Sequence, residues 1–226
     1  YAVHSAKVLA KLLWEIFDEK YVAVLLGGRA VNEAVLKERF DYIFFTGSPA
    51  VGSVVMEAAA KHLTPVTLEL GGKSPCIVDK TADIKRAARR IVWGKFLNAG
   101  QTCVAPDYVL VQEEVKEPLL RKMKHYIRKM YRDEPLLNPE YPKIINEKHF
   151  NRLKKMLLEQ DGEIITGGRM DADTLKIEPT LLAGLTERSK VMQEEIFGPI
   201  LPVLTYDFID EAVDTIRSMA HPLALY

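Results

Sequence analysis

Short apolar runs alternate with amphipathic segments along this chain, and that alternation restricts its fold more than any other feature. Residues 1–18 carry apolar side chains at helical spacing, and residues 22–26 then form a continuous apolar run that two glycines close. Continuous runs of this kind are typical of strands that are buried on both faces of a parallel sheet. A strand–helix–strand–helix order implies right-handed crossovers, so the sequence predicts the α/β class.

The same patterns predict the remaining elements. Beyond residues 1–18, helices are expected over residues 32–38, 51–62, 84–96, 116–131, 148–158 and 210–219. Strands are expected over residues 22–26, 42–45, 66–70, 75–78, 108–111, 163–165, 177–182 and 200–205. Gly71 and Gly72 interrupt the pattern, which restarts after them, so we expect a domain boundary there.

The charges of the chain cancel, with 31 Lys and Arg against 31 Asp and Glu. This balance argues against a protein that binds nucleic acid or a membrane surface through a basic face. The apolar runs are shorter than the roughly 20 residues of a transmembrane helix, and no segment has the pattern of a signal or transit peptide. Two cysteines, Cys76 and Cys103, cannot form a disulfide framework, which indicates a reducing compartment such as the cytoplasm. The five histidines show no metal-ligand spacing, so we expect no metal site.

Cys103 is the first candidate for chemistry. It lies in the small and polar stretch of residues 98–106, which joins a predicted helix to a predicted strand. A thiolate is the nucleophilic form of cysteine, and backbone N–H groups in a turn that contains glycine can stabilise a thiolate and an oxyanion beside it. The spacing alone also allows an inert loop cysteine. Cys76, in the apolar run of residues 75–78, is expected to be a core residue.

Two acids are further candidates. Glu69 lies near the end of a predicted strand, and ligand crevices in parallel sheets open at the carboxyl ends of the strands. A carboxylate there can act as a general base, although a salt bridge at the strand edge explains it equally well. Glu195 ends the polar triplet 193–195 before an apolar turn, so it could point into a site or be solvated.

A helix start follows the predicted strand at residues 42–45. Ser48 is expected to cap this helix, with Pro49 as its first residue, and the free N–H groups there could bind a phosphate. Capping alone is the simpler explanation. Gly47 and Gly52 have the glycine spacing of a phosphate loop but lack its Lys, and no GxGxxG follows a strand, so neither standard nucleotide motif is present.

Four motifs in order along the chain resemble those of the NAD(P)-dependent aldehyde dehydrogenase superfamily. They are Phe45-Thr46-Gly47-Ser48, Leu68-Glu69-Leu70-Gly71-Gly72-Lys73-Ser74-Pro75, Gly100-Gln101-Thr102-Cys103 and Glu195-Ile196-Phe197-Gly198-Pro199. The longer strings at residues 60–69 and 102–108 look like the class 3 branch, which acts on medium-chain, fatty and aromatic aldehydes. The resemblance covers essentially the whole chain.

The resemblance implies roles for the three candidates. Cys103 matches the nucleophile that forms a thiohemiacetal with the aldehyde and then a thioester. Glu69 matches the acid that activates the deacylating water. Glu195 matches the acid that binds the nicotinamide ribose, and in the class 3 branch it is also a candidate base.

The resemblance also implies a cofactor, a domain division and a partner. The cofactor would be NAD or NADP, with Gly47 and Ser48 at its pyrophosphate and Phe197 beside the nicotinamide. Residues 1–72 would be the C-terminal part of a Rossmann-like, parallel-sheet cofactor domain, and residues 73–226 an α/β catalytic domain incomplete at its C-terminus. The full-length protein would be a homodimer in the cytoplasm.

The chain departs from the family in its length, because family members are about twice as long. An upstream segment of the family supplies an Asn to the oxyanion hole and a Lys near the cofactor ribose, and a downstream segment completes the catalytic domain. We therefore expect a central piece of a longer enzyme. Asn98 is not expected to replace the missing Asn, because it belongs to another motif and shapes its own turn.

Two other functions stay open. One is a cofactor-independent thiol hydrolase that uses Cys103, although no His or Asp has a recognisable relation to this cysteine. The other is a noncatalytic relative of the same fold, against which the joint presence of Cys103, Glu69 and Glu195 argues.

Overall fold

The computed structural model describes residues 2–226, which form two compact units. The first unit runs up to Leu70 and the second is Gly71–Tyr226. Each unit is described by itself. No helix in the described part of the chain is long and apolar enough to cross a membrane.

The first unit contains two parallel strands and three helices. They are α1 (Val3–Ile16), α2 (Arg29–Val35), β1 (Ile43–Gly47), α3 (Pro49–Ala60) and β2 (Val66–Leu70). Helix α3 connects the two strands, and its buried Gly52 permits close packing, because a Cβ at this position would come within 2.8 Å of the Leu70 side chain. Ser48 caps α3 and Pro49 is its first residue, as predicted.

The sequence prediction for this unit is right for five elements and wrong for one. The helix predicted over residues 1–18 is present as α1, and its residue 1 lies outside the described residues. Helix α2 begins and ends three residues earlier than predicted, after Gly28 in an extended conformation. Residues 22–26 do not form a strand. A continuous apolar run becomes a strand only where a neighbouring strand takes its N–H and C=O groups, and no described strand lies beside this one.

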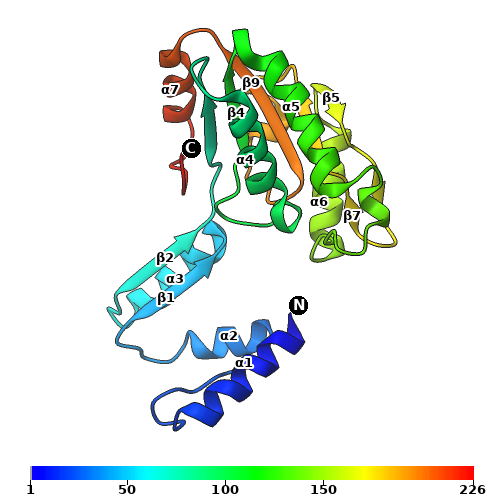
Figure 1. Ribbon diagram of the computed structural model, residues 1–226. Helices are drawn as coiled ribbons and strands as arrows, with labels where there is room; N and C mark the ends of the chain where they lie inside the picture. Colours follow the sequence, from blue (N-terminus) through cyan, green and yellow to red (C-terminus); the bar gives the residue numbers. More distant parts are fainter. Residues whose placement is uncertain (1) are drawn as a thin grey trace. The chain divides into compact units, whose positions relative to one another are not determined.

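The second unit contains a five-stranded sheet with helices on both faces (Figure 1). Its elements are β3 (Pro75–Val78), α4 (Ile84–Phe96), β4 (Tyr108–Gln112), α5 (Glu113–Tyr131), α6 (Glu147–Leu158), β5 (Glu163–Thr166), β6 (Met170–Asp171), β7 (Lys176–Ile177), β8 (Thr180–Ala183), β9 (Ile200–Tyr206) and α7 (Ile209–Arg217). The strand order is β3-β4-β9-β8-β5, and the first four strands are parallel.

Successive residues of β4 show how the two faces are covered. Val109 and Val111 lie in the core under α4 and α5, whereas Tyr108 and Leu110 lie in the core on the face of α6 and α7. This alternation is the period of two that a strand imposes on its side chains. It confirms the α/β class.

Two details of this unit correct the prediction. The strand predicted over residues 177–182 is split into β7 and β8, because Pro179 between them has no N–H to continue a ladder. Strand β7 pairs instead with β6, which the sequence did not reveal. Strand β5 is antiparallel to β8, so the sheet is mixed at this edge rather than wholly parallel.

Candidate functional site

Three loops of the second unit meet at the amino ends of parallel strands. Residues 71–74 precede β3, residues 101–107 precede β4 and residues 193–199 precede β9. Asp107 ties the three together: its backbone N–H donates to the Ser74 carbonyl at 2.7 Å, and its Oδ1 accepts from the Ile196 N–H at 3.0 Å. The Cys103 loop and the segment that carries Glu195 are therefore fixed to one another.

Cys103 is exposed, within a turn that the Ala105 N–H closes by donating to the Thr102 carbonyl at 3.1 Å. The hydroxyl group of Tyr226 donates to the carbonyl of Val104, the next residue after the cysteine, at 2.6 Å. The backbone N–H and carbonyl of Tyr226 both form hydrogen bonds with β3, to Pro75 and Ile77. Sequence patterns gave no sign that Tyr226 would hold this turn.

A left-handed segment leads into the cysteine loop. Asn98, Ala99 and Gly100 have φ of 52°, 52° and 74°. The Asn98 side chain donates to the Gln101 carbonyl at 3.1 Å, so Asn98 shapes its own turn, as expected. A Cβ at Gly100 would overlap the Gly198 carbonyl oxygen, so glycine is required where this loop packs against the Glu195 segment.

Glu195 is half-buried, and its carboxylate lies against the backbone of Gly71 and Gly72. A Cβ at Gly71 would overlap the carboxylate oxygens, and the Gly72 N–H donates a hydrogen bond to them. Burial raises the pKa of Glu195, and the charge of Asp107 adds to this effect. The Gly72 N–H and the nearby cations Lys95 and Arg152 act in the opposite direction. Of the two alternatives for Glu195, the structure therefore supports an acid turned into the protein.

A side chain from α6 also fixes the segment that carries Glu195. The guanidinium group of Arg152 donates to the carbonyls of Glu195 and Ile196. Phe197 follows with a φ of 46° and a side chain that is 38% exposed. A left-handed phenylalanine is uncommon, and it marks a backbone that its surroundings hold in place.

Two lysines surround Asp107 in the interior. Lys73 Nζ lies 2.7 Å from Asp107 Oδ2 and also donates to the carbonyls of Val191 and Glu194, at 3.1 Å each. Lys95 is fully buried, its Nζ is 3.9 Å from Asp107 Oδ1, and it has no hydrogen-bond partner among the described residues. Burial lowers the pKa of Lys95 to about 8, although Asp107 opposes this shift.

The sequence analysis missed this charged cluster. Lys73 and Asp107 lie within the strings that resemble the family, but no local pattern joins them to one another. Lys95 offered a local signal, because it follows Ile91 and Val92 by four and three residues and therefore shares the buried face of α4.

In the first unit, parallel pairing brings the other candidates to one sheet edge. Gly47 is the last residue of β1 and Ser48 follows it, and Glu69 lies opposite Thr46 in the register with β2. Glu69 is exposed and has no ion pair with a described residue, so the salt-bridged alternative is absent here. The N-terminus of α3 and a free carboxylate thus share this edge.

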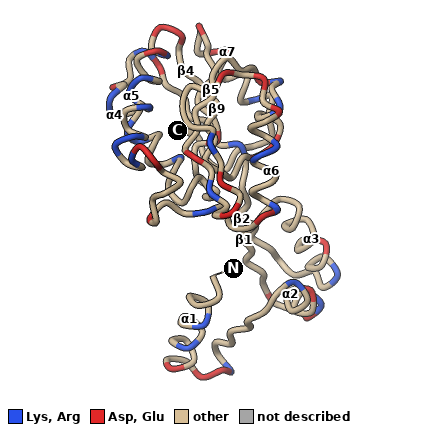
Figure 2. Tube along the Cα trace, turned by 90° about the vertical axis from the view of Figure 1, so that its right-hand side faces the viewer, with Lys and Arg blue, Asp and Glu red and all other residues tan. Residues whose placement is uncertain are grey.

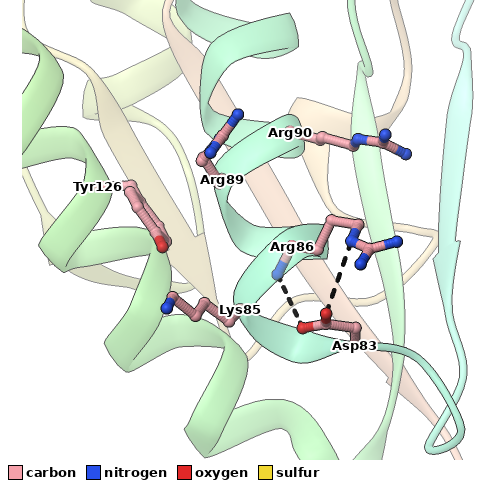
Figure 3. A pocket seen from close by; sticks show the side chains of 6 residues that line it. All are labelled: Asp83, Lys85, Arg86, Arg89, Arg90 and Tyr126. Atoms are coloured by element: carbon pink, nitrogen blue, oxygen red, sulfur yellow. Dashed lines mark hydrogen bonds and ion pairs between the residues drawn. The ribbon is translucent and has the colours of Figure 1, made fainter.

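A separate hollow of about 310 Å³ lies on the outer face of α4 (Figure 3). It is lined by Asp83, Lys85, Arg86, Arg89, Arg90 and Tyr126. Basic residues gather on α4 and α5 (Figure 2), but Asp83 already caps α4 and pairs with Arg86 within the hollow. The hollow lies toward the first turns of α4, whereas Lys95 lies in the last. The described residues contain no group of three side chains suited to a metal ion.

Comparison with known proteins decides the family. The model of the Aldehyde dehydrogenase family matches residues 1–221. This chain belongs to the aldehyde dehydrogenase family. It is 48% identical over 223 residues to mouse aldehyde dehydrogenase family 3 member A2, covering 99% of this chain and 46% of the relative. It is 50% identical over 221 residues to the 4,4'-diaponeurosporen-aldehyde dehydrogenase of Staphylococcus aureus, covering 98% of this chain and 48% of that protein.

Solved structures agree with this assignment. The substrate-bound Staphylococcus aureus AldH superposes with a TM-score of 0.92 at 49% identity, over 98% of this chain and 48% of the other. The NAD-dependent aldehyde dehydrogenase of Sinorhizobium meliloti superposes with a TM-score of 0.84 at 34% identity, over 94% and 44%. The family 3 relatives confirm the class 3-like resemblance, and this chain spans about half the length of the curated relatives it matches.

Proposed function

We propose that this protein oxidises aldehydes to carboxylic acids with NAD or NADP, and that Cys103 is its nucleophile. The observation that carries this proposal is the exposed Cys103 turn, which Asp107 ties to the segment of the half-buried Glu195. Acyl transfer through a thioester needs a nucleophile and a proton acceptor fixed relative to one another. Membership of the family supports the same reaction.

We assign cofactor binding to Gly47, Ser48, Glu195 and Phe197, with residues 1–72 as cofactor domain and residues 73–226 as catalytic domain. Gly47 and Ser48 fit a pyrophosphate, because the start of α3 presents backbone N–H groups at the end of β1. Glu195 would hold the nicotinamide ribose, and Phe197 would lie beside the nicotinamide. The bound cofactor would supply the hydride acceptor.

The residues of this chain would carry the covalent steps. Cys103 Sγ bonds to the aldehyde carbon and forms a thiohemiacetal, which becomes a thioester when its C–H hydride passes to the hydride acceptor and its O–H proton is released. Water then attacks the thioester carbon, the C–S bond breaks, and the carboxylic acid leaves while the thiolate is restored. Glu69 would take the proton of this water, and Glu195 is the alternative base.

Substitution of each cysteine tests the nucleophile. Cys103→Ala should abolish aldehyde-dependent NADH or NADPH formation in the complete protein, whereas Cys76→Ala should keep most of it. Cys76 is the matched control because burial raises its thiol pKa to about 12, so it is not a thiolate at neutral pH. Equal activity in the two variants would contradict the assignment. If the protein cleaves esters without a cofactor and forms no NADH or NADPH, it is a thiol hydrolase. If it shows neither activity, it is a noncatalytic relative.

Substitution of each acid separates their roles. Glu69→Gln should slow thioester hydrolysis and leave cofactor affinity nearly intact, whereas Glu195→Gln should weaken cofactor binding or slow the hydride step. Acyl-enzyme trapped by acid quench and weighed by mass spectrometry distinguishes them. Accumulation of acyl-enzyme in Glu195→Gln would transfer the role of base to Glu195.

The proposed substrates are medium-chain, fatty or aromatic aldehydes. One relative is named for an aldehyde of its own, 4,4'-diaponeurosporen-aldehyde, and others belong to family 3. We also propose a homodimer for the complete protein. Helix α3 leaves Val51, Val54 and Met56 exposed, and these apolar side chains offer a surface that a second copy would cover.

A further inference from the structure

The last turn of α4 buries a cation without giving it a partner of its own. Lys95 is fully buried, and its Nζ donates no hydrogen bond to any described group. Its one ion-pair contact in the described chain is Asp107 Oδ1, at 3.9 Å. A buried ammonium without hydrogen bonds is costly, so its presence requires a compensating charge.

Asp107 alone does not supply that compensation. Its Oδ2 is 2.7 Å from Lys73 Nζ, and its Oδ1 already accepts from the Ile196 N–H. Two ammonium groups therefore share one carboxylate, which leaves an excess of one positive charge. The Asp107 Oδ1 that faces Lys95 also accepts from the N–H of Ile196, the residue after Glu195, so Glu195 is the second acid beside this cluster and acts electrostatically on Lys95.

We propose that Lys95 is a positioning residue for Glu195, and that its buried charge is the counter-charge that keeps the Glu195 carboxylate ionised against the backbone of Gly71 and Gly72. The cluster is neutral only when Lys73 and Lys95 are balanced by both Asp107 and Glu195. The proposal rests on the proposed function of Glu195. In either role its carboxylate must be ionised, because it accepts a hydrogen bond from the ribose or a proton from water.

The other charges around Glu195 fix the direction of the effect. Asp107 repels its negative charge, while Arg152 and the Gly72 N–H favour it. Arg152 also lies 3.7 Å from the carboxylate of the exposed Glu194, so its positive charge is divided between Glu194 and Glu195. On the other side of the cluster, Lys73 lies over the ring of Tyr108, whose pKa burial raises to about 12, so that phenol is neutral. Burial and Asp107 raise the pKa of Glu195, and Lys95 is one of the groups that lower it. Loss of Lys95 should therefore raise this pKa.

Three variants test this inference. Lys95→Met removes the charge at similar volume, Lys95→Arg keeps it, and Lys85→Met removes an exposed charge from the first turn of the same helix. The ionisation of Glu195 is followed by ¹³C NMR of carboxyl-labelled protein, with the signal assigned by its loss in Glu195→Gln. We expect the midpoint to rise by about one pH unit or more in Lys95→Met, and to stay unchanged in Lys85→Met. Lys95→Arg should restore most of the shift.

The kinetic counterpart is the acid limb of the kcat/KM profile of the complete protein, which should move by the same amount in Lys95→Met. Its rate on the plateau at higher pH should stay within about threefold of the wild type, which a merely structural role would not give. An unchanged Glu195 midpoint in Lys95→Met overturns the proposal. If Lys95→Met does not fold, Lys95→Gln takes its place, and failure of both to fold also overturns it. Wild-type protein that makes neither NADH nor NADPH would refute the proposed function, while the NMR titration still reports the coupling of Lys95 and Glu195.

Discussion

Removal of the Lys95 charge should raise stability while it lowers activity only on the acid limb of the pH profile, because this ammonium destabilises the native state. Burial lowers the pKa of Lys95 from 10.5 to about 8. Between these values the unfolded chain binds more protons than the native protein, so native stability rises with pH across that window. Below pH 8 the group is charged in both states and the full cost is present. The change in pKa corresponds to a cost of about 3 kcal/mol.

Above pH 8 the pH dependence of the difference between wild type and Lys95→Met reports this cost, because Lys95 loses its proton in that window in the wild type and is absent from the variant. At pH 7 we expect Lys95→Met to be more stable by about 1 to 3 kcal/mol, because the cost of the buried ammonium, about 3 kcal/mol, is partly offset by the penalty of about 1.4 kcal/mol for raising the pKa of Glu195 by about one unit. This stability advantage of Lys95→Met should fall as the pH rises from 8 toward 10.5, because the wild type regains the cost of its ammonium. Urea denaturation followed by circular dichroism, from pH 7 to 10.5, measures both free energies of unfolding, with Lys85→Met as control. Parallel curves for wild type and Lys95→Met would refute the reasoning.

Two further substitutions address the cysteine loop. Gly100→Ala should lower stability by about 2 kcal/mol or more, because φ is 74° and the added Cβ overlaps a carbonyl oxygen; Gly184→Ala, where φ is 68° but the space is open, should cost less in the same thermal unfolding assay. Tyr226→Phe removes one hydrogen bond and should slow the first turnover of Cys103 in the complete protein by about threefold to tenfold. Tyr206→Phe, which also loses one bond to a backbone carbonyl, should leave that rate unchanged, and equal rates in the two variants would show that the phenol does not hold the turn.

The sequence predicted strand bounds best where proline or glycine residues mark where a strand begins or ends. The strands at residues 66–70 and 75–78 have the predicted bounds, because Pro65, Pro75 and two glycines delimit them. The run at residues 22–26 is equally apolar, but it does not form the predicted strand. Strand formation depends on neighbours that periodicity does not contain.

The candidate site divides in the same way. Cys103 and Glu195 stand in loops whose composition or sequence strings mark them, so they were predicted as candidates. The cluster of Lys73, Lys95 and Asp107 comes from three segments that only the tertiary fold joins. A lysine on the apolar face of α4 was visible in the sequence, but its partner acid was not.

The two units place their candidate groups at opposite ends of their strands. In the first unit Ser48 and Glu69 lie at the carboxyl ends of parallel strands, where open α/β sheets usually bind ligands, and the N-terminus of α3 supplies positive potential for a phosphate.

In the second unit the loops precede their strands, so α4 directs its C-terminal end toward the loop of Cys103. A helix C-terminus carries negative potential, which disfavours anions and favours cations in the last turn. Lys95 lies in that turn, and Lys73 lies across Asp107 from it. The two buried ammonium groups therefore reverse the potential at this strand edge, which allows a carboxylate such as Glu195 to be charged there.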